Sequence, residues 1–170
     1  QVDVVNNGIN TSGGGNITLT SSGVITQSAG ALLSTTGSLS TTSVGGVQLS
    51  NANAVRYFSG INSVSGNVSF ANSGALLDVS VNNGAGTGAV FVKSAGDLGL
   101  LNTGVITSAT GNAAVLVAGG NFVNSSNYNI TLLGTGARWL IYSTNPSANT
   151  VGALLTGSTD FQQYGATYPS

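Results

Sequence analysis

A repeat with a period of about 22 positions restricts the fold of this chain more than any other feature of its sequence. One series of apolar residues has intervals of 22, 21 and 22, within the tetrapeptides GVIT, GVQL, NVSF and AVFV; its members are Ile25, Val47, Val68 and Val90. A second series, Ile17, Leu39 and Ile61, has intervals of 22 and 22. The tripeptide Val24-Ile25-Thr26 also recurs as Val105-Ile106-Thr107. This periodicity is typical of a solenoid, in which each unit buries its apolar face against its neighbours.

Strands, not helices, fit the repeating unit. Glycine recurs every few residues, and each glycine inside a helix lowers helix stability by about 1 kcal/mol relative to alanine. Two residues that favour helices are also scarce, since Glu is absent and Lys occurs once. Segments such as Asn16–Thr20 and Gly46–Ser50 alternate apolar with polar residues, which is the pattern of a strand with one buried face. We therefore predict an all-β parallel β-helix (β-solenoid) of about six coils of 21–24 residues, stacked roughly 4.8 Å apart.

The lumen of this solenoid is predicted to be dry and aliphatic. Its predicted members are Ile17, Ile25, Leu39, Val47, Val68, Val90 and Val115. Phe58, Phe70 and Phe91 are expected to fill the lumen or to pack just outside a turn, and not to stack on a ligand. Asparagine is frequent near the predicted turns, where it either forms ladders with the Asn of the next coil or serves the backbone of its own turn. The Asn residues concerned are Asn51, Asn53, Asn62, Asn67, Asn72, Asn82 and Asn83.

The chain divides into residues 1–142, predicted to form the coils, and residues 143–170, predicted to be a covering segment or a linker. Val2–Asn16 fits an incoming coil, and the spacing loosens later, from Val92 to Val115 (23) and from Val115 to Trp139 (24). Both prolines follow residue 140. Because a solenoid ends in unpaired strand edges, the aromatic tail is expected to fold back over the last coil or along its side. The predicted end or cap residues are Arg138, Trp139, Tyr142, Phe161, Tyr164 and Tyr168.

Charge is scarce, with three cations, four aspartates and a net charge of −1. Three scattered cations provide no basic surface for nucleic acid or an anionic membrane, so neither is an expected partner. No apolar run approaches the ~20 residues of a membrane span. Without cysteine, the cellular compartment cannot be inferred from disulfides. We expect the sequence to be either a segment of a longer chain or a mature fragment, whose targeting signal lies elsewhere.

The repeats, together with the stretches ARWLIYSTNPSANT and DFQQYGATYP, resemble filamentous haemagglutinin-like large exoproteins, which are adhesins of the two-partner secretion type. The resemblance implies a right-handed parallel β-helix within a secreted filament on the bacterial cell surface. The N-terminal secretion domain of that family carries Asn-Pro signatures before its helix, whereas Asn145-Pro146 lies at the other end of this chain. The segment therefore resembles a rod segment downstream of the secretion domain.

The sequence lacks the usual groups for catalysis. Without His, Cys or Glu there is no Ser-His-Asp or Cys-His arrangement and no zinc site of His or Cys ligands. Asp78 and Asp97 are separated by an interval of 19, near one coil, so they are either a carboxylate pair or two separate turn-capping residues. Gly84–Gly88 has the glycines of a phosphate loop without the Lys-Ser/Thr that should follow, and is predicted to be a turn. We expect no enzyme activity, cofactor or metal.

Three functions remain, and a structural and adhesive rod agrees best with the repeats and the Ser/Thr/Asn-rich composition. Its expected partners are further repeats of the same chain and the surface of a host or neighbouring cell, through carbohydrate or protein. A carbohydrate-active β-helix enzyme needs acids that four aspartates hardly provide. An ice-binding β-solenoid needs Thr in register, and Thr35-Thr36 and Thr41-Thr42 do not persist at coil spacing, so ice is not the expected ligand.

Overall fold

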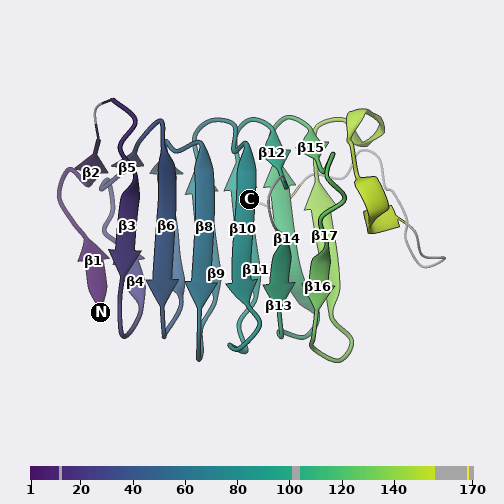
Figure 1. Ribbon diagram of the computed structural model, residues 1–170, viewed down its shortest axis with the longest axis horizontal. Helices are drawn as coiled ribbons and strands as arrows, with labels where there is room; N and C mark the ends of the chain where they lie inside the picture. The colour runs from purple at the N-terminus through teal and green to yellow at the C-terminus, as the bar shows by residue number, and fades with distance from the viewer. Residues whose placement is uncertain (12, 101–103, 156–167, 169–170) are drawn as a thin grey trace.

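The computed structural model describes residues 1–11, 13–100, 104–155 and 168, and it confirms the predicted parallel β-solenoid (Figure 1). Sheet I has seven strands: β1 (Val2–Val4), β4 (Ile25–Gln27), β7 (Val47–Asn53), β9 (Val68–Asn72), β11 (Val90–Ser94), β14 (Asn112–Ala118) and β17 (Arg138–Tyr142). Sheet II has six: β3 (Ile17–Thr20), β6 (Ser38–Ser43), β8 (Tyr57–Asn62), β10 (Asp78–Asn83), β13 (Val105–Thr107) and β16 (Ile130–Leu132).

A short third face completes each coil between sheet I and sheet II. It contains the pairs β2 (Ile9–Asn10) with β5 (Leu33–Ser34) and β12 (Leu98–Gly99) with β15 (Phe122–Val123). Every pairing between named strands is parallel, and each joins a strand to the equivalent strand one coil away. Six coils thus supply a strand to both sheets, and β17 begins a seventh.

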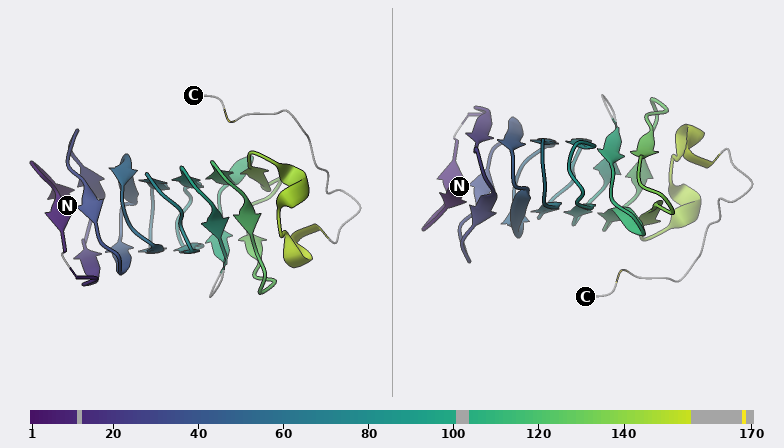
Figure 2. Two further views of the ribbon diagram at one scale, coloured as in Figure 1. Left: turned by 90° about the horizontal axis from the view of Figure 1, so that it is seen from above. Right: turned by 90° about the horizontal axis from the view of Figure 1, so that it is seen from below.

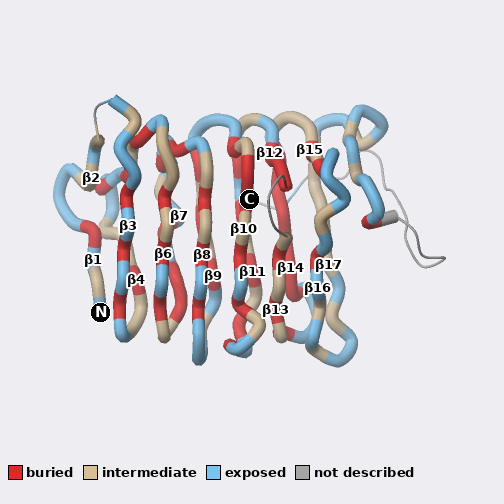
Figure 3. The backbone as a smooth tube through the Cα atoms, viewed as in Figure 1, coloured by how far each residue is buried: buried red, intermediate tan, exposed pale blue. Residues whose placement is uncertain are grey.

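The core fills the lumen between the two sheets, and buried positions alternate with exposed ones along many strands (Figure 3). Ile25, Val47, Val68 and Val90 are fully buried and stand in register on four successive strands of sheet I, as the repeat predicted. Ile17 and Leu39 are likewise buried and paired in sheet II. A fixed coil length places these side chains above one another, so the aliphatic lumen is confirmed at these positions.

Two residues of the apolar repeat pattern, one of them a predicted lumen residue, face outward because coil length varies. Ile61 pairs with Thr42, points outward and is 50% exposed, whereas Phe58 takes the lumen position opposite Leu39. The reason is a shorter third face: the interval from Ile25 to Leu39 is 14 (39 − 25), but the interval from Val47 to Phe58 is 11 (58 − 47). A constant interval of 22 residues from Leu39 therefore passes Phe58 and ends at Ile61, which faces outward.

Val115 is the second of these residues. It was predicted to line the lumen, but it lies on the outer side of sheet I. Its partners across the sheet are Phe91 and Leu140, which also face outward, while Ala114 and Leu116 occupy the lumen positions of β14. Phe91 is correspondingly only half-buried and lies outside the core. The step from β11 to β14 is 24 residues, because Val92 pairs with Leu116 (116 − 92), so the interval of 23 from Val92 ends one residue short, on Val115. In a strand, a shift of one residue moves a side chain to the opposite face.

Buried polar side chains line two corners of the lumen in rows that run from coil to coil. One row contains Asn53, Asn72 and Ser94 and is extended by the half-buried Gln27, and the other contains Ser43, Asn62, Asn83 and Thr107. Asn62 donates from Nδ2 to Asn83 Oδ1 at 2.8 Å, which confirms an asparagine ladder at this corner. Most of the other bonds run to the backbone of turns, for example from Asn83 Nδ2 to the Gly88 carbonyl at 2.7 Å. Among the described residues, every buried side-chain N or O atom has a hydrogen-bond partner.

The C-terminal end of the stack is closed by two short 3-10 helices, η1 (Pro146–Ala148) and η2 (Gly152–Leu155) (Figure 2). Thr150 continues the third face through a bridge to Val123. The chain then enters η2, so the seventh coil adds a helical turn instead of a further strand beside β16. Leu154 of η2 is buried as part of the core cluster, and the partly buried Val151 and Trp139 pack against this cluster.

Gly60 is a small residue at a lumen position of β8, beside two stacked aromatic rings. Phe58 and Phe70 stack with centroids 4.2 Å apart and planes at 8°, and a Cβ added at Gly60 would lie 3.2 Å from Phe58 Cζ. We expect Gly60→Val to lower the free energy of unfolding by about 1–3 kcal/mol through overpacking. Urea denaturation provides the measurement. The matched control is Ser59→Val, which faces outward and should change stability by less than about 0.5 kcal/mol; equal stability of both variants would contradict this packing.

Candidate binding face

The outer face of sheet II carries a row of hydroxyl groups that crosses four coils. Strand register places four residues, the hydroxyl column, above one another: Thr18, Ser40, Ser59 and Ser80. Thr18 is exposed and the three serines are half-buried. Adjacent strands lie about 4.8 Å apart, so the column extends over roughly 14 Å along the axis. Each hydroxyl donates one hydrogen bond and accepts two, which suits a ligand that also presents hydroxyl groups.

A second outward row runs beside the hydroxyl column but has mixed chemistry. Its members, in register, are Thr20, Thr42, Ile61, Asn82, Ile106 and Thr131. Threonine does not persist at coil spacing in either row, as the sequence indicated: the first row has one threonine followed by three serines, at intervals of 22, 19 and 21. Ile61, Asn82 and Ile106 interrupt the second row, so the face does not form a two-dimensional array of threonines.

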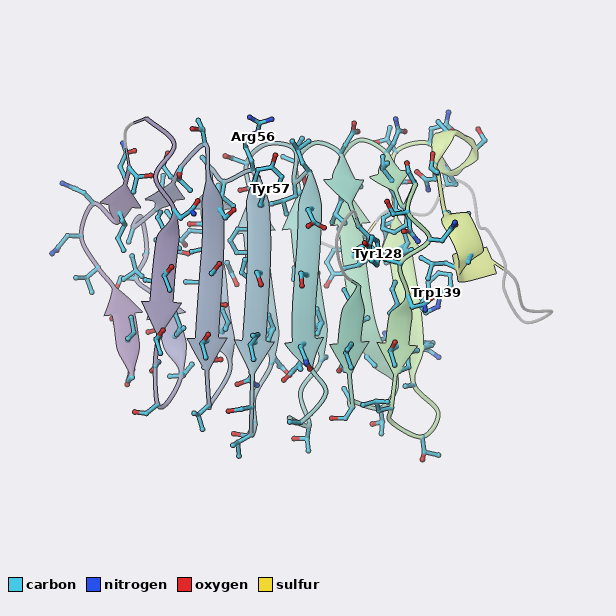
Figure 4. All side chains as sticks on the ribbon, in the orientation of Figure 1. Arg56, Tyr57, Tyr128 and Trp139 are labelled. Atoms are coloured by element: carbon cyan, nitrogen blue, oxygen red, sulfur yellow. The ribbon has the colours of Figure 1, made fainter. Side chains whose placement is uncertain are left out.

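Tyr57 extends this face toward the third face of the solenoid. It lies in register between Ser38 and Asp78, and Figure 4 shows it with Arg56 at the end of β8. The Arg56 guanidinium carbon lies 5.8 Å from the centroid of the Tyr57 ring, within the range of a cation–π contact. Tyr57 thus adds an aromatic ring and Arg56 a cation to a face otherwise built from hydroxyls, amides and β-branched side chains.

The aspartates suspected as a catalytic pair belong to different rows. Asp78 opens β10 on sheet II, is 7% exposed and aligns with Tyr57. Asp97 precedes β12 on the third face, where its Oδ1 accepts a hydrogen bond from the Asn121 backbone N–H at 2.8 Å. Within the described residues, no group of three or more His, Cys, Asp or Glu could hold a metal ion. Asp97 therefore has the turn-capping arrangement that the sequence offered as the alternative.

The predicted end residues lie at the C-terminal coil in different environments. Trp139 points toward the lumen and is half-buried, and Figure 4 shows it near the C-terminal end. Arg138 is exposed and donates from Nε to Asn112 Oδ1 at 2.5 Å. Tyr142 faces outward and contacts Tyr168. Phe161 and Tyr164 lie outside the described residues. The sequence missed Val151 and Leu154, which cover the end of the lumen, because GALL also occurs within the repeats.

The Gly84–Gly88 stretch connects β10 to β11 without a helix, as expected for a turn. None of the helices in the described part of the chain has the length and hydropathy needed to cross a membrane. A comparison of the chain with protein-family models, with curated proteins and with solved structures finds no match.

Proposed function

We propose that this chain is a structural and adhesive rod segment of a secreted filament on a bacterial cell surface. The observation that carries the proposal is the outer face of sheet II, where the hydroxyl column and Tyr57 form a continuous surface along the axis. The parallel coils supply rigidity because each coil packs on the next over its full length. The resemblance of the repeats to filamentous haemagglutinin-like exoproteins supports the secreted location.

Carbohydrate of a host or neighbouring cell is the partner whose chemistry fits this face best. Sugar hydroxyls donate and accept hydrogen bonds, as Ser40, Ser59 and Ser80 do, and the apolar side of a sugar ring packs on aromatic rings such as Tyr57. Repeated coils repeat the same groups along the rod, so a linear polysaccharide aligned with the axis would meet several of them at once. Many contacts that are individually weak would together give the rod a high affinity for the polysaccharide.

The test measures adhesion of beads coated with the full chain to intact cells, to periodate-treated cells and to protease-treated cells. Periodate destroys carbohydrate and protease destroys protein receptors, so we expect only periodate to abolish adhesion. A Ser59→Lys variant should bind at least about tenfold more weakly, a loss of roughly 1.4 kcal/mol, because a long cation displaces the ligand from the hydroxyl column.

The matched control is Ser69→Lys, since Ser69 is also a half-buried serine facing outward, but from sheet I. It should bind like the parent chain. If Ser59→Lys and Ser69→Lys lost equal binding strength, the hydroxyl column would not be the binding surface, and another surface or the added charge would explain the loss. A parent chain that adheres to no cell type would remove the adhesive part of the proposal.

A further inference from the structure

The outer face of sheet I changes its chemistry abruptly between β9 and β11. One outward row runs in strict register through all seven strands: Asp3, Thr26, Gln48, Ser69, Phe91, Val115 and Leu140. The first four side chains are polar and the last three are apolar. A neighbouring outward row ends in Val117 and Tyr142. We call the five residues Phe91, Val115, Val117, Leu140 and Tyr142 the apolar end of sheet I.

Burial distinguishes the apolar end from the rest of the outer face. Val115 and Val117 are 9% and 8% exposed, although both point away from the lumen. Gln48, on the polar part of the same face, is exposed. Two neighbouring valines are therefore nearly inaccessible to solvent although they lie on the outside of the solenoid. If it were left uncovered, a contiguous apolar patch of this kind would mark an interaction site.

Tyr168 lies on this surface. Its ring centroid is 5.2 Å from that of Phe91 at an interplanar angle of 43°, and 5.3 Å from that of Tyr142 at 81°. These distances and angles are those of favourable tilted and edge-to-face aromatic pairs. Phe91 and Tyr142 belong to β11 and β17, so the Tyr168 ring bridges strands on either side of β14. Tyr168 itself keeps 39% of its surface exposed, so the contact is shallow.

We propose that the apolar end of sheet I is a docking surface for the chain's own C-terminal tail, anchored by Tyr168, and that this anchor prevents a second copy from binding there. Thirteen residue steps separate Leu155 from Tyr168 (168 − 155), which span at most roughly 45 Å when extended. The tail is therefore long enough to return from η2 to this face. Tethering gives the ring a high effective concentration, so a shallow contact suffices to hold it.

The absence of cysteine from the sequence allows a direct test. A nitroxide attached to Ser170→Cys places a spin label two residues from Tyr168. Docking predicts strong broadening of the backbone NMR signals of Phe91 and Tyr142, fading along sheet I toward β1. Adding Tyr168→Ser should remove this gradient. An unchanged gradient in that variant, or its absence in the labelled parent, would overturn the proposal.

The second arm measures self-association of the full chain by light scattering and sedimentation. Tyr168→Ser should form dimers as its concentration rises, while the parent stays monomeric over the same range. Adding Phe91→Ser to Tyr168→Ser should reverse dimerisation, because the exposed apolar surface shrinks. Val64→Ser, which removes an exposed apolar side chain from the turn between β8 and β9, is the control and should behave like the parent. A monomeric Tyr168→Ser variant, or dimers insensitive to Phe91→Ser, would contradict the protective role.

Discussion

Replacing Ile25 by aspartate is expected to unfold the N-terminal coils of the solenoid. Ile25 is fully buried in the lumen, between Val2 and Val47 of the neighbouring strands. The substitution removes an aliphatic side chain and buries an unpaired carboxylate, which together cost more than about 5 kcal/mol. That equals a large part of the ~5–15 kcal/mol by which a domain is stable. Circular dichroism during urea denaturation measures the loss.

Hydrogen exchange locates the effect within the stack, because a coil contacts only its neighbours. Protection should fall most in β1, β4 and β7 and least in β14 and β17. Gln48→Asp is the matched control, since it introduces the same charge on the outer side of β7. It should remain within about 0.5 kcal/mol of the parent. An Ile25→Asp variant as stable as Gln48→Asp would refute the assignment of Ile25 to the lumen.

The second large effect is expected for Asn62→Leu, which keeps the approximate size of the side chain and removes its polar atoms. Asn62 Oδ1 accepts hydrogen bonds from the Gly46 backbone N–H at 2.9 Å and from Ser43 Oγ at 3.0 Å. Its Nδ2 donates to the Ser65 carbonyl at 2.7 Å and to Asn83 Oδ1 at 2.8 Å. Each buried group left unpaired costs about 1–3 kcal/mol, so we expect a loss of about 3–6 kcal/mol.

Thermal and urea unfolding of Asn62→Leu, compared with Asn82→Leu, test this expectation. Asn82 is exposed on the outer face, where its Oδ1 accepts a hydrogen bond from the nearby Gly84 N–H at 3.1 Å. Losing this exposed bond should cost about 1 kcal/mol or less. If the two leucine variants were equally stable, the buried polar rows would not contribute to the stability of the stack.

The sequence was sufficient to predict the architecture because every coil must place apolar side chains in the lumen. These residues recur at nearly constant spacing in sheet I, so their register could be predicted from the sequence: Ile25, Val47, Val68 and Val90. The shortened third face and the 24-residue step from β11 to β14 were not visible, since a change in coil length leaves no mark on the hydrophobicity of the sequence. For this reason the second series continued to Ile61, which faces outward, and Val115 was wrongly assigned to the lumen.

The recurring tripeptide Val-Ile-Thr shows the same limit locally. Its first copy lies in sheet I with Ile25 in the lumen, whereas its second copy lies in sheet II with Ile106 facing outward. Identical residues therefore occupy opposite faces, because the surrounding register decides which side of the strand is buried. Sequence identity within a repeat does not specify the face.

The candidate binding face was harder to predict than the core. Serine and threonine are abundant throughout the chain, and only the register of β3, β6, β8 and β10 selects Thr18, Ser40, Ser59 and Ser80 as neighbours. The contact of Tyr168 with Phe91 and Tyr142 was equally invisible, because it depends on the path of a segment outside the repeat. The sequence predicted a covering role for the tail without locating the surface it contacts.

The parallel pairing of successive coils also determines how this rod responds to tension. Hydrogen bonds between strands connect each coil to the next and therefore point along the axis. A pull along the axis opens these bonds at the terminal coil first, because each coil is held only by its neighbours. Each detached coil releases about 22 residues, or roughly 70 Å of extended chain, in place of one ~4.8 Å step. The solenoid would thus lengthen stepwise under load and dissipate mechanical work before the chain itself is strained.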